Sequence, residues 1–243
     1  QGMSGLMGIT GTEVSGPQKL GVAIVDVLTG LYATIGIQAA IIEREQSGKG
    51  QKIDLSLYDS AVSALINIGS NYLMTSKIPK RLGNEHANIV PYQTFITEDG
   101  EMVIAVGNDG QFKKLCEIID YPELAMDARF QTNPARVKHR QKLIPILQRA
   151  FLQKNTAYWK EKCDVNNVPC GPIQNLKEVY VDPQLNERNM FIEMDHPIAG
   201  KIEMIGSPLH LSRTPVTFRH HPPTIGEHNQ EILNKLHATK SNE

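Results

Sequence analysis

Cysteine is scarce in this 243-residue sequence, and its three cysteines lie far apart. No Cys-x-x-Cys pair is present, so neither a disulfide framework nor a metal site is indicated, and a reducing, cytoplasmic setting is the better interpretation. Net charge is nearly absent as well. The 25 Lys and Arg residues balance 26 Asp and Glu residues, which gives no sign of the basic surface typical of nucleic-acid binding.

The start of the sequence has no initiator methionine, and it lacks the basic residues and clean apolar stretch of a signal peptide. We therefore expect the sequence to begin inside a domain. Hydrophobic residues make up 40% of the chain, which is ordinary for a globular protein. The length allows one large domain or two smaller ones.

There is one long apolar run, Leu20–Ile42, and Asp26 is its single charged residue. The run is long enough to cross a membrane, but it also contains Gln38, two threonines and three glycines, and no other segment resembles it. A helix of about Ala23–Glu45, buried in a protein core, is therefore the better prediction.

Asp26 has two interpretations, because an ionised carboxylate among apolar side chains is costly unless it is paired, hydrogen-bonded or protonated. In the structural one, it accepts hydrogen bonds from backbone N–H groups at a helix start, which is common. In the chemical one, it is a nucleophile or general base whose reactivity rises as it loses water. The residue pattern alone favours the structural interpretation.

After this helix the pattern predicts a strand at Lys52–Leu57 and a second helix at about Asp59–Ser76, an order typical of α/β folds. Lys77–Pro91 is polar and has prolines near both ends, so it is predicted to be a long loop. Within it, the small polar segment from Gly83 to Asn88 is equally typical of a lid over a ligand and of a plain linker.

The second half predicts a hairpin around Glu98-Asp99-Gly100, since apolar and polar residues alternate on both sides of that turn. A helical block follows, with Asn133-Pro134 expected to start its middle helix and Pro145 expected to kink or split it. Asn155 or Thr156 is expected to cap the next helix. Beyond these, we predict a rigid turn at Asn167–Ile173, a short helix at 176–181, a strand pair at 190–194 and 201–205, and a final helix at 228–236.

Other reactive side chains have weaker patterns. His220 and His221 lack a third ligand at metal-binding spacing, so no metal site is expected. Cys170 lies between prolines without an evident base, which argues against a catalytic thiol. His86 could act as an acid or base, although a single loop histidine is more often simply solvated.

Eight segments in order resemble the class III CoA-transferases, the family of formyl-CoA transferase, and they extend over almost the whole chain. They are SGLMGITG, GPQKLGVAIVDVLTG, SGKGQKIDLSLYD, GNEHANIVPYQTF, VPCGPI, DPQLNERNMF, HPIAGKIEMIGSP and PPTIGEH. The segment RLGNEHANIVPYQTF is most similar to the members that act on dicarboxylic acids, such as succinyl-CoA:glutarate CoA-transferases.

The resemblance implies an α/β fold with a Rossmann-like large domain, incomplete here, and a small α+β domain in an interlocked homodimer. Family members are longer at the N-terminus, and that part would hold most contacts to CoA. Four parts are then expected: 1–78 with the reactive carboxylate, 79–91 as linker and lid, 92–181 as the small domain, and 182–243 as a linker returning to the large domain.

The resemblance also implies an activity. Asp26 corresponds to the family's nucleophile, and Gly83, Asn84, His86 and Asn88 correspond to its lid, although only one glycine is present here. The expected reaction moves CoA between small carboxylic acids through an aspartyl anhydride and an aspartyl-CoA thioester, with CoA thioesters as substrates and no resident cofactor. The alternatives are an α-methylacyl-CoA racemase of the same superfamily and a non-catalytic fragment that binds CoA or forms dimers.

Overall fold

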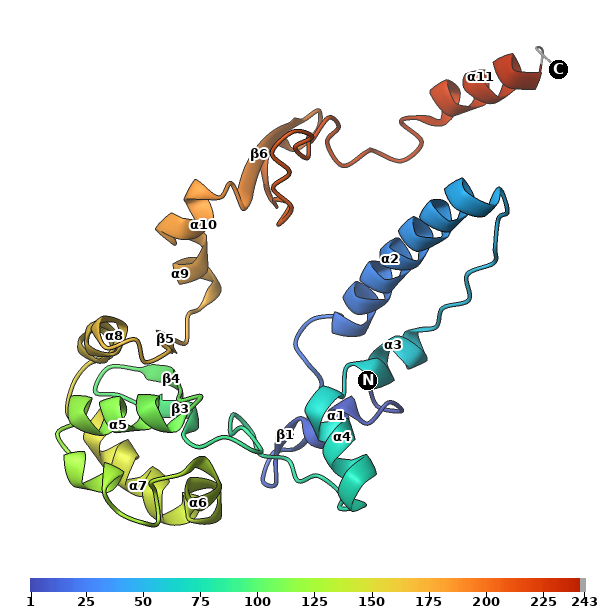
Figure 1. The fold of residues 1–243 in the computed structure, drawn as a ribbon. Helices are drawn as coiled ribbons and strands as arrows, with labels where there is room; N and C mark the ends of the chain where they lie inside the picture. Colours follow the sequence, from blue (N-terminus) through green and yellow to red (C-terminus); the bar gives the residue numbers. More distant parts are fainter. Residues whose placement is uncertain (241–243) are drawn as a thin grey trace. The chain divides into compact units, whose positions relative to one another are not determined.

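The computed structural model describes residues 1–240 and divides into two compact units, Gln1–Ile173 and Gln174–Glu243. Residues 1–75 of unit 1 are mainly helical (Figure 1). Its elements are α1 (Leu6–Ile9), β1 (Gly11–Thr12), β2 (Gly16–Pro17), α2 (Ile24–Ser47), α3 (Leu57–Ser63) and α4 (Ile66–Thr75).

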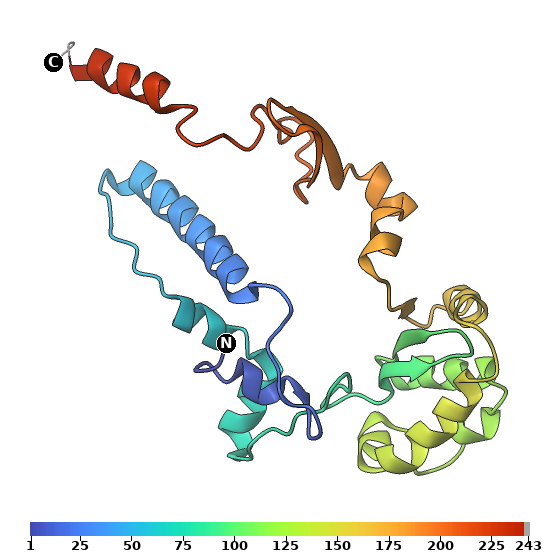
Figure 2. The same ribbon diagram turned by 180° about the vertical axis from the view of Figure 1, so that it is seen from behind.

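The long helix predicted from the apolar run is confirmed as α2, which both views show as one continuous helix (Figures 1 and 2). It ends at Gly48, whose left-handed backbone lets its N–H donate to the Arg44 carbonyl at 2.8 Å. The expected burial is wrong. Only 6% of the most apolar 18-residue window of α2 is buried. The helix is apolar around its whole circumference but packs mainly against the short helix α3, so most of its apolar surface is open to solvent.

By length and composition alone, α2 is the one helix among residues 1–240 that could cross a membrane. The same properties fit the core helix of a protein whose other parts cover it. A single such helix is weak support for a membrane span.

The strand predicted at Lys52–Leu57 is wrong. Residues 51–56 form no regular structure, and α3 begins at Leu57. Ser56 caps α3 by accepting a hydrogen bond from the Asp59 N–H at 3.0 Å. Alternation alone does not make a strand, because a strand also needs a neighbour to pair with, and no such neighbour is present in the part of the chain that the structure describes.

The predicted second helix is divided in two, α3 and α4, by a break at Ala64–Leu65. The lengthy loop predicted at Lys77–Pro91 is confirmed, since residues 77–91 contain no helix or strand. The hairpin is also confirmed, as β3 (Tyr92–Ile96) and β4 (Glu101–Ala105), with Tyr92 opposite Ala105.

A third strand, β5 (Cys170–Pro172), pairs with β4 and completes an antiparallel sheet in the order β3-β4-β5. We predicted a rigid turn there, because two prolines and a glycine lie close together. An edge strand tolerates proline, since only one side of it pairs with the sheet.

Five helical segments surround this sheet and close the small domain: α5 (Asp109–Ile118), the 3₁₀-helix η1 (Pro122–Ala125), α6 (Asn133–Lys138), α7 (Arg140–Phe151) and α8 (Thr156–Val165). The helix α7 packs on β3, and α8 packs on β5. Large side chains fill the interior completely, among them Phe95, Phe112, Phe130 and Phe151, each at most 1% exposed. This is a close-packed core of its own.

Helix starts in the small domain follow the predicted chemistry with one exception. Asn155 caps α8, as expected. The cap of α6 is Thr132 rather than Asn133, whose side chain makes other contacts described below. Pro145 lies inside α7 without splitting it.

Unit 2 contains α9 (Leu176–Tyr180), α10 (Pro183–Glu187), β6 (Phe191–His196), β7 (Gly200–Ile205) and α11 (Asn229–Lys240). The predicted short helix, strand pair and final helix are confirmed, whereas α10 was not predicted. The hairpin pairs Phe191 with Ile205 and His196 with Gly200. The Tyr180 and Phe191 rings stack with centroids 4.4 Å apart, which joins α9 to the hairpin.

Candidate active site

Asp26 lies in the first turn of α2, at the edge of a cleft of about 430 Å³. The cleft is bounded by the first four residues of the chain, the start of α2 and the start of α3. Its buried wall consists of Ser4, Val25 and Ala61. Ser4 is held by a hydrogen bond from its hydroxyl to the Gln1 carbonyl at 3.1 Å.

The Asp26 carboxylate is exposed, and it makes no hydrogen bond or ion pair with any residue that the structure describes. The structure therefore does not support the interpretation in which backbone donors satisfy this carboxylate. It also corrects the expectation of a dry environment, because the apolar side chains of α2 lie along a helix that is itself open to solvent. The first turn of a helix is nevertheless a favourable place for an anion.

The loop Lys77–Pro91 is fastened at its first half to the N-terminal residues. The Gly83 N–H donates to the Gly11 carbonyl at 2.8 Å, and the Arg81 guanidinium donates to the Thr12 carbonyl at 3.2 Å. Gly83 has a left-handed backbone with φ +59°, and a Cβ there would lie 3.0 Å from the Thr12 methyl. Both the backbone angle and the close approach to Thr12 favour glycine at position 83.

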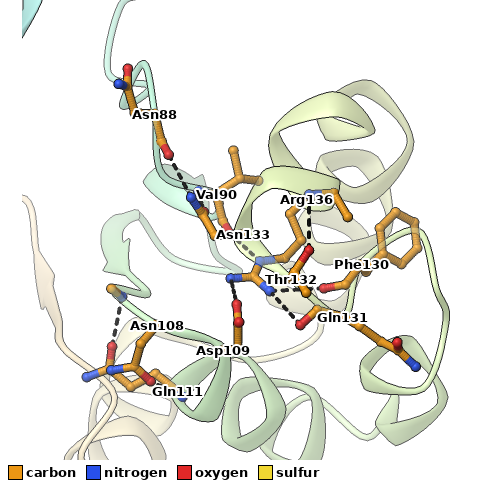
Figure 3. A network of polar contacts seen from close by, with 12 residues as sticks. Asn88, Val90, Asn108, Asp109, Gln111, Phe130, Gln131, Thr132, Asn133 and Arg136 are labelled. Atoms are coloured by element: carbon orange, nitrogen blue, oxygen red, sulfur yellow. Dashed lines mark hydrogen bonds and ion pairs between the residues drawn. The ribbon is translucent and has the colours of Figure 1, made fainter.

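The other end of the loop is fastened to the small domain by Asn133 (Figure 3). The Asn133 amide donates to the Asn88 carbonyl at 2.8 Å and accepts from the Val90 N–H at 3.0 Å. This side chain thus pairs with the backbone much as a neighbouring strand would, which explains why it does not cap α6. On its other side, Asn88 exchanges side-chain hydrogen bonds with Asn71 of α4.

Arg136 of α6 also attaches this end of the loop to the small domain, from inside the core, as Figure 3 shows. Its side chain is fully buried and donates to the Val90 carbonyl at 2.6 Å, to the Phe130 carbonyl at 3.0 Å and to Asp109 at 2.8 Å. The guanidinium also lies 4.4 Å from the Phe112 ring centroid. Burial lowers the pKa of Arg136, and the Asp109 carboxylate opposes that shift.

The predicted lid residues thus lie together on one fastened loop, but they do not meet Asp26. Gly83 and His86 border a separate cleft of about 210 Å³, next to α4, and the cleft at Asp26 is lined by none of Gly83, Asn84, His86 and Asn88. Asn84 donates to the Thr94 hydroxyl at 3.3 Å, which turns it toward β3.

Sequence reasoning missed Arg136 and Arg140, which hold this loop. A basic residue at a helix start or inside a helix has no signal in sequence that distinguishes a buried anchor from a solvated side chain. The Pro-flanked turn before Tyr92 is the one local hint that the chain is fixed there.

The remaining candidates add no second reactive site. No group of three or more His, Cys, Asp or Glu side chains that could hold a metal occurs among residues 1–240. His221 instead approaches Glu227 at 3.4 Å. Burial raises the pKa of the Cys163 thiol to about 12 and also raises that of Cys170, so neither is prone to form the reactive thiolate.

These features fit the class indicated by the sequence motifs, and a family model confirms it: the chain belongs to CoA-transferase family III, whose model matches residues 1–229. It is 40% identical to the succinate–glutarate CoA-transferase of Agrobacterium fabrum over 97% of the chain. It is 41% identical to the human succinyl-CoA:glutarate CoA-transferase over 96% of the chain.

A solved structure shows the same mixed α/β fold. A CAIB/BAIF family protein from Brucella suis is 41% identical to the chain and matches it with a TM-score of 0.78 over 97% of its length. The chain spans 59% of the Agrobacterium protein, 53% of the human protein and 61% of the Brucella chain.

Proposed function

We propose that this chain contains the nucleophile of an acyl-CoA:carboxylate CoA-transferase, and that Asp26 is this nucleophile. One observation supports the proposal above all: the single charged residue of the apolar run Leu20–Ile42 is an unpaired carboxylate at the edge of a cleft. The two relatives named above and the succinyl-CoA:mesaconate CoA-transferase of Haloarcula hispanica are CoA-transferases by name, which favours a transferase over a racemase.

The proposed reaction begins when an Asp26 carboxylate oxygen attacks the thioester carbonyl of an acyl-CoA. The carbon–sulfur bond breaks, CoA leaves as a thiolate, and a mixed aspartyl-acyl anhydride remains. The thiolate then attacks the aspartyl carbonyl, which releases the free acid and leaves an aspartyl-CoA thioester. An acceptor carboxylate attacks this thioester, and the same steps run in reverse. Covalent catalysis of this kind divides one difficult exchange into easier stages.

The substrates we propose are succinyl-CoA and a small dicarboxylic acid, following the names of the two relatives above. In this chain Gly83 and His86 border a cleft separate from Asp26. In the assembled enzyme, Gly83, Asn84, His86 and Asn88 are proposed to border the reacting groups and to exclude water, which would otherwise hydrolyse the anhydride. The exposure of Asp26 makes such shielding necessary, and a large part of it has to come from surfaces that cover α2.

The assembly is also a proposal. We infer a cytoplasmic, interlocked homodimer with a Rossmann-like large domain, in which 77–91 and 182–190 are the linkers between domains. The division into 1–78, 79–91, 92–181 and 182–243 belongs to the same proposal. An apolar helix as exposed as α2 supports it, because such a helix needs a partner surface.

The decisive variant is Asp26→Ala in the full-length protein. CoA transfer from succinyl-CoA to glutarate should fall by about 10⁴-fold or more, since removal of a covalent nucleophile leaves only binding effects. Asp54→Ala is a matched control, because Asp54 is an 88% exposed carboxylate of the same region. Unchanged transfer in the Asp26 variant would refute the role of Asp26.

A screen of acceptor acids separates the alternatives. Exchange of CoA among dicarboxylic acids supports the transferase. Deuterium incorporation from solvent at the carbon next to the thioester, without exchange of acids, would instead indicate a racemase. Absence of both would indicate a non-catalytic protein.

A further inference from the structure

The segment Glu85–Asn88 is held in place by a residue that has no assigned role, Arg140. This arginine opens α7, and its side chain is only 16% exposed. It forms an ion pair with the Glu85 carboxylate at 2.6 Å and donates a second hydrogen bond to the His86 carbonyl. One guanidinium therefore fixes both a side chain and the adjacent backbone.

The position of Arg140 is unfavourable without this partner. The N-terminus of a helix has a partial positive charge, so a cation in the first turn is repelled, whereas an anion is attracted. Glu85 provides that anion. Because Arg140 pairs with the Glu85 carboxylate, the repulsion between Glu85 and a negatively charged molecule nearby is reduced.

Three further contacts fix His86 itself. Its backbone N–H donates to the Tyr92 carbonyl at 2.8 Å, and its ring stacks on the Tyr92 ring with centroids 5.2 Å apart and planes 13° from parallel. The Asn88 N–H donates to His86 Nδ1 at 3.1 Å. A ring nitrogen that accepts a hydrogen bond has no proton, so the neutral imidazole holds its proton on Nε2.

His86 Nε2 makes no hydrogen bond with any residue that the structure describes. The residue is half-buried and borders the cleft of about 210 Å³ together with Asn67 of α4 and Lys80. Glu85, held by Arg140, also borders this cleft, and the Lys80 ammonium lies 3.4 Å from the Glu13 carboxylate. The Asn67 amide and the His86 Nε2–H are the neutral donors of the cleft, and such donors match the oxygens of a carboxylate.

We propose that Arg140 is a positioning residue that holds His86 as a fixed Nε2–H donor to the carboxylate of the acid substrate. This inference rests on the proposed transferase function. It replaces a mobile glycine-rich lid with a segment that is attached to the small domain and contributes a specific hydrogen bond.

Two substitutions at His86 test the donor. The Nε2 of glutamine is as many bonds from Cα as the Nε2 of histidine, whereas the Nδ2 of asparagine corresponds to Nδ1. His86→Gln should therefore keep the KM for the acceptor acid within about threefold of the wild-type value. His86→Asn should raise it by about tenfold or more, as expected for loss of a hydrogen bond to a charged group. Equal KM values for the two variants would overturn the donor role.

Substitutions at Arg140 test the positioning role. Arg140→Met should raise the KM for the acceptor acid by about tenfold, whereas the enzyme–CoA adduct should still form from saturating succinyl-CoA, because Asp26 is intact. Arg140→Lys keeps the charge and one of the two contacts, so it should lie between. Arg149→Met, an exposed arginine of the same helix, is the matched control and should behave as wild type.

Hydrogen exchange measures how firmly Arg140 holds the segment Glu85–Asn88, without relying on activity. In Arg140→Met, the backbone N–H groups of His86 and Asn88 should exchange at least about tenfold faster than in the wild type and in Arg149→Met. Unchanged exchange, or an unchanged KM for the acid, would refute the role of Arg140. If the wild type formed no CoA adduct at all, the proposed function would fail. Faster exchange in the variant would still show that Arg140 holds the segment Glu85–Asn88.

Discussion

The small domain and the N-terminal region of the same chain are built in opposite ways. The small domain has a core of eighteen buried residues between Val90 and Val168, built from the three-stranded sheet and the helices that pack with it. Residues 1–78 have four buried side chains, Ser4, Val25, Ser60 and Ala61, and an apolar helix open to solvent. The part that holds the proposed nucleophile thus depends on other surfaces for its packing, and the part that holds the loop does not.

This difference shows that the two parts of the candidate site are positioned by different regions of the chain. Residues Glu85–Val90 take their positions from the small domain, through Asn133, Arg136 and Arg140. Asp26 takes its position from α2 and the first residues of the chain. The contacts that hold His86 thus lie within residues 85–140, whereas the apolar surface of α2 beside Asp26 is open to solvent.

The largest expected effect on the free energy of unfolding comes from a substitution in the small-domain core. The Phe151 ring contacts Phe95 and Trp159, with centroids 4.8 and 5.2 Å away, and the Trp159 indole donates to the Phe151 carbonyl at 2.8 Å. Phe151→Ala leaves a cavity in this cluster and should lower the free energy of unfolding by about 3–5 kcal/mol. Urea denaturation measures it, and a loss below about 1 kcal/mol would contradict a closed core.

A smaller effect is expected where the loop is attached. Arg136→Met removes the donor to the Val90 and Phe130 carbonyls, which then lie buried without that partner. The free energy of unfolding should fall by about 2–3 kcal/mol. Arg129→Met provides the control, since Arg129 is 51% exposed in its pair with Asp127 and should cost at most about 1 kcal/mol. Similar losses for both arginines would remove the case for a buried anchor.

The smallest expected effect on the free energy of unfolding comes from a substitution on the exposed helix α2. Leu31 of α2 is 57% exposed, so Leu31→Ala in this chain should change the free energy of unfolding by less than about 0.5 kcal/mol. In an assembled protein whose other surfaces cover α2, the same substitution should cost about 2 kcal/mol or more. A small cost in the assembled protein would show that α2 stays exposed.

Local signals predicted much of this fold. The hairpin at Glu98–Gly100 and the cap at Asn155 follow from residues within a few positions of each other, and both are confirmed. The strand expected at Lys52–Leu57 and the turn expected at Cys170 are wrong because a strand depends on its neighbour, which local sequence does not contain. In both cases the outcome depends on whether residues far apart in the chain pair with each other.

The candidate site divides in the same way. The sequence marks Asp26 and the segment Gly83–Asn88 as candidates, because an unusual charge and a polar loop are visible in it, and the resemblance to the family implies their roles. Arg140 could not be predicted, since its importance comes from Glu85, fifty-five residues earlier in the chain. The exposure of Asp26 could not be predicted either, because it depends on which surfaces lie against α2.

The most direct test of the central claim is mass spectrometry of the full-length protein after incubation with succinyl-CoA in the absence of an acceptor acid. Asp26 as nucleophile predicts a peptide containing residue 26 with CoA attached through a thioester, and loss of that adduct on addition of glutarate. An adduct at another residue, or continued CoA transfer in Asp26→Ala, would contradict the proposal.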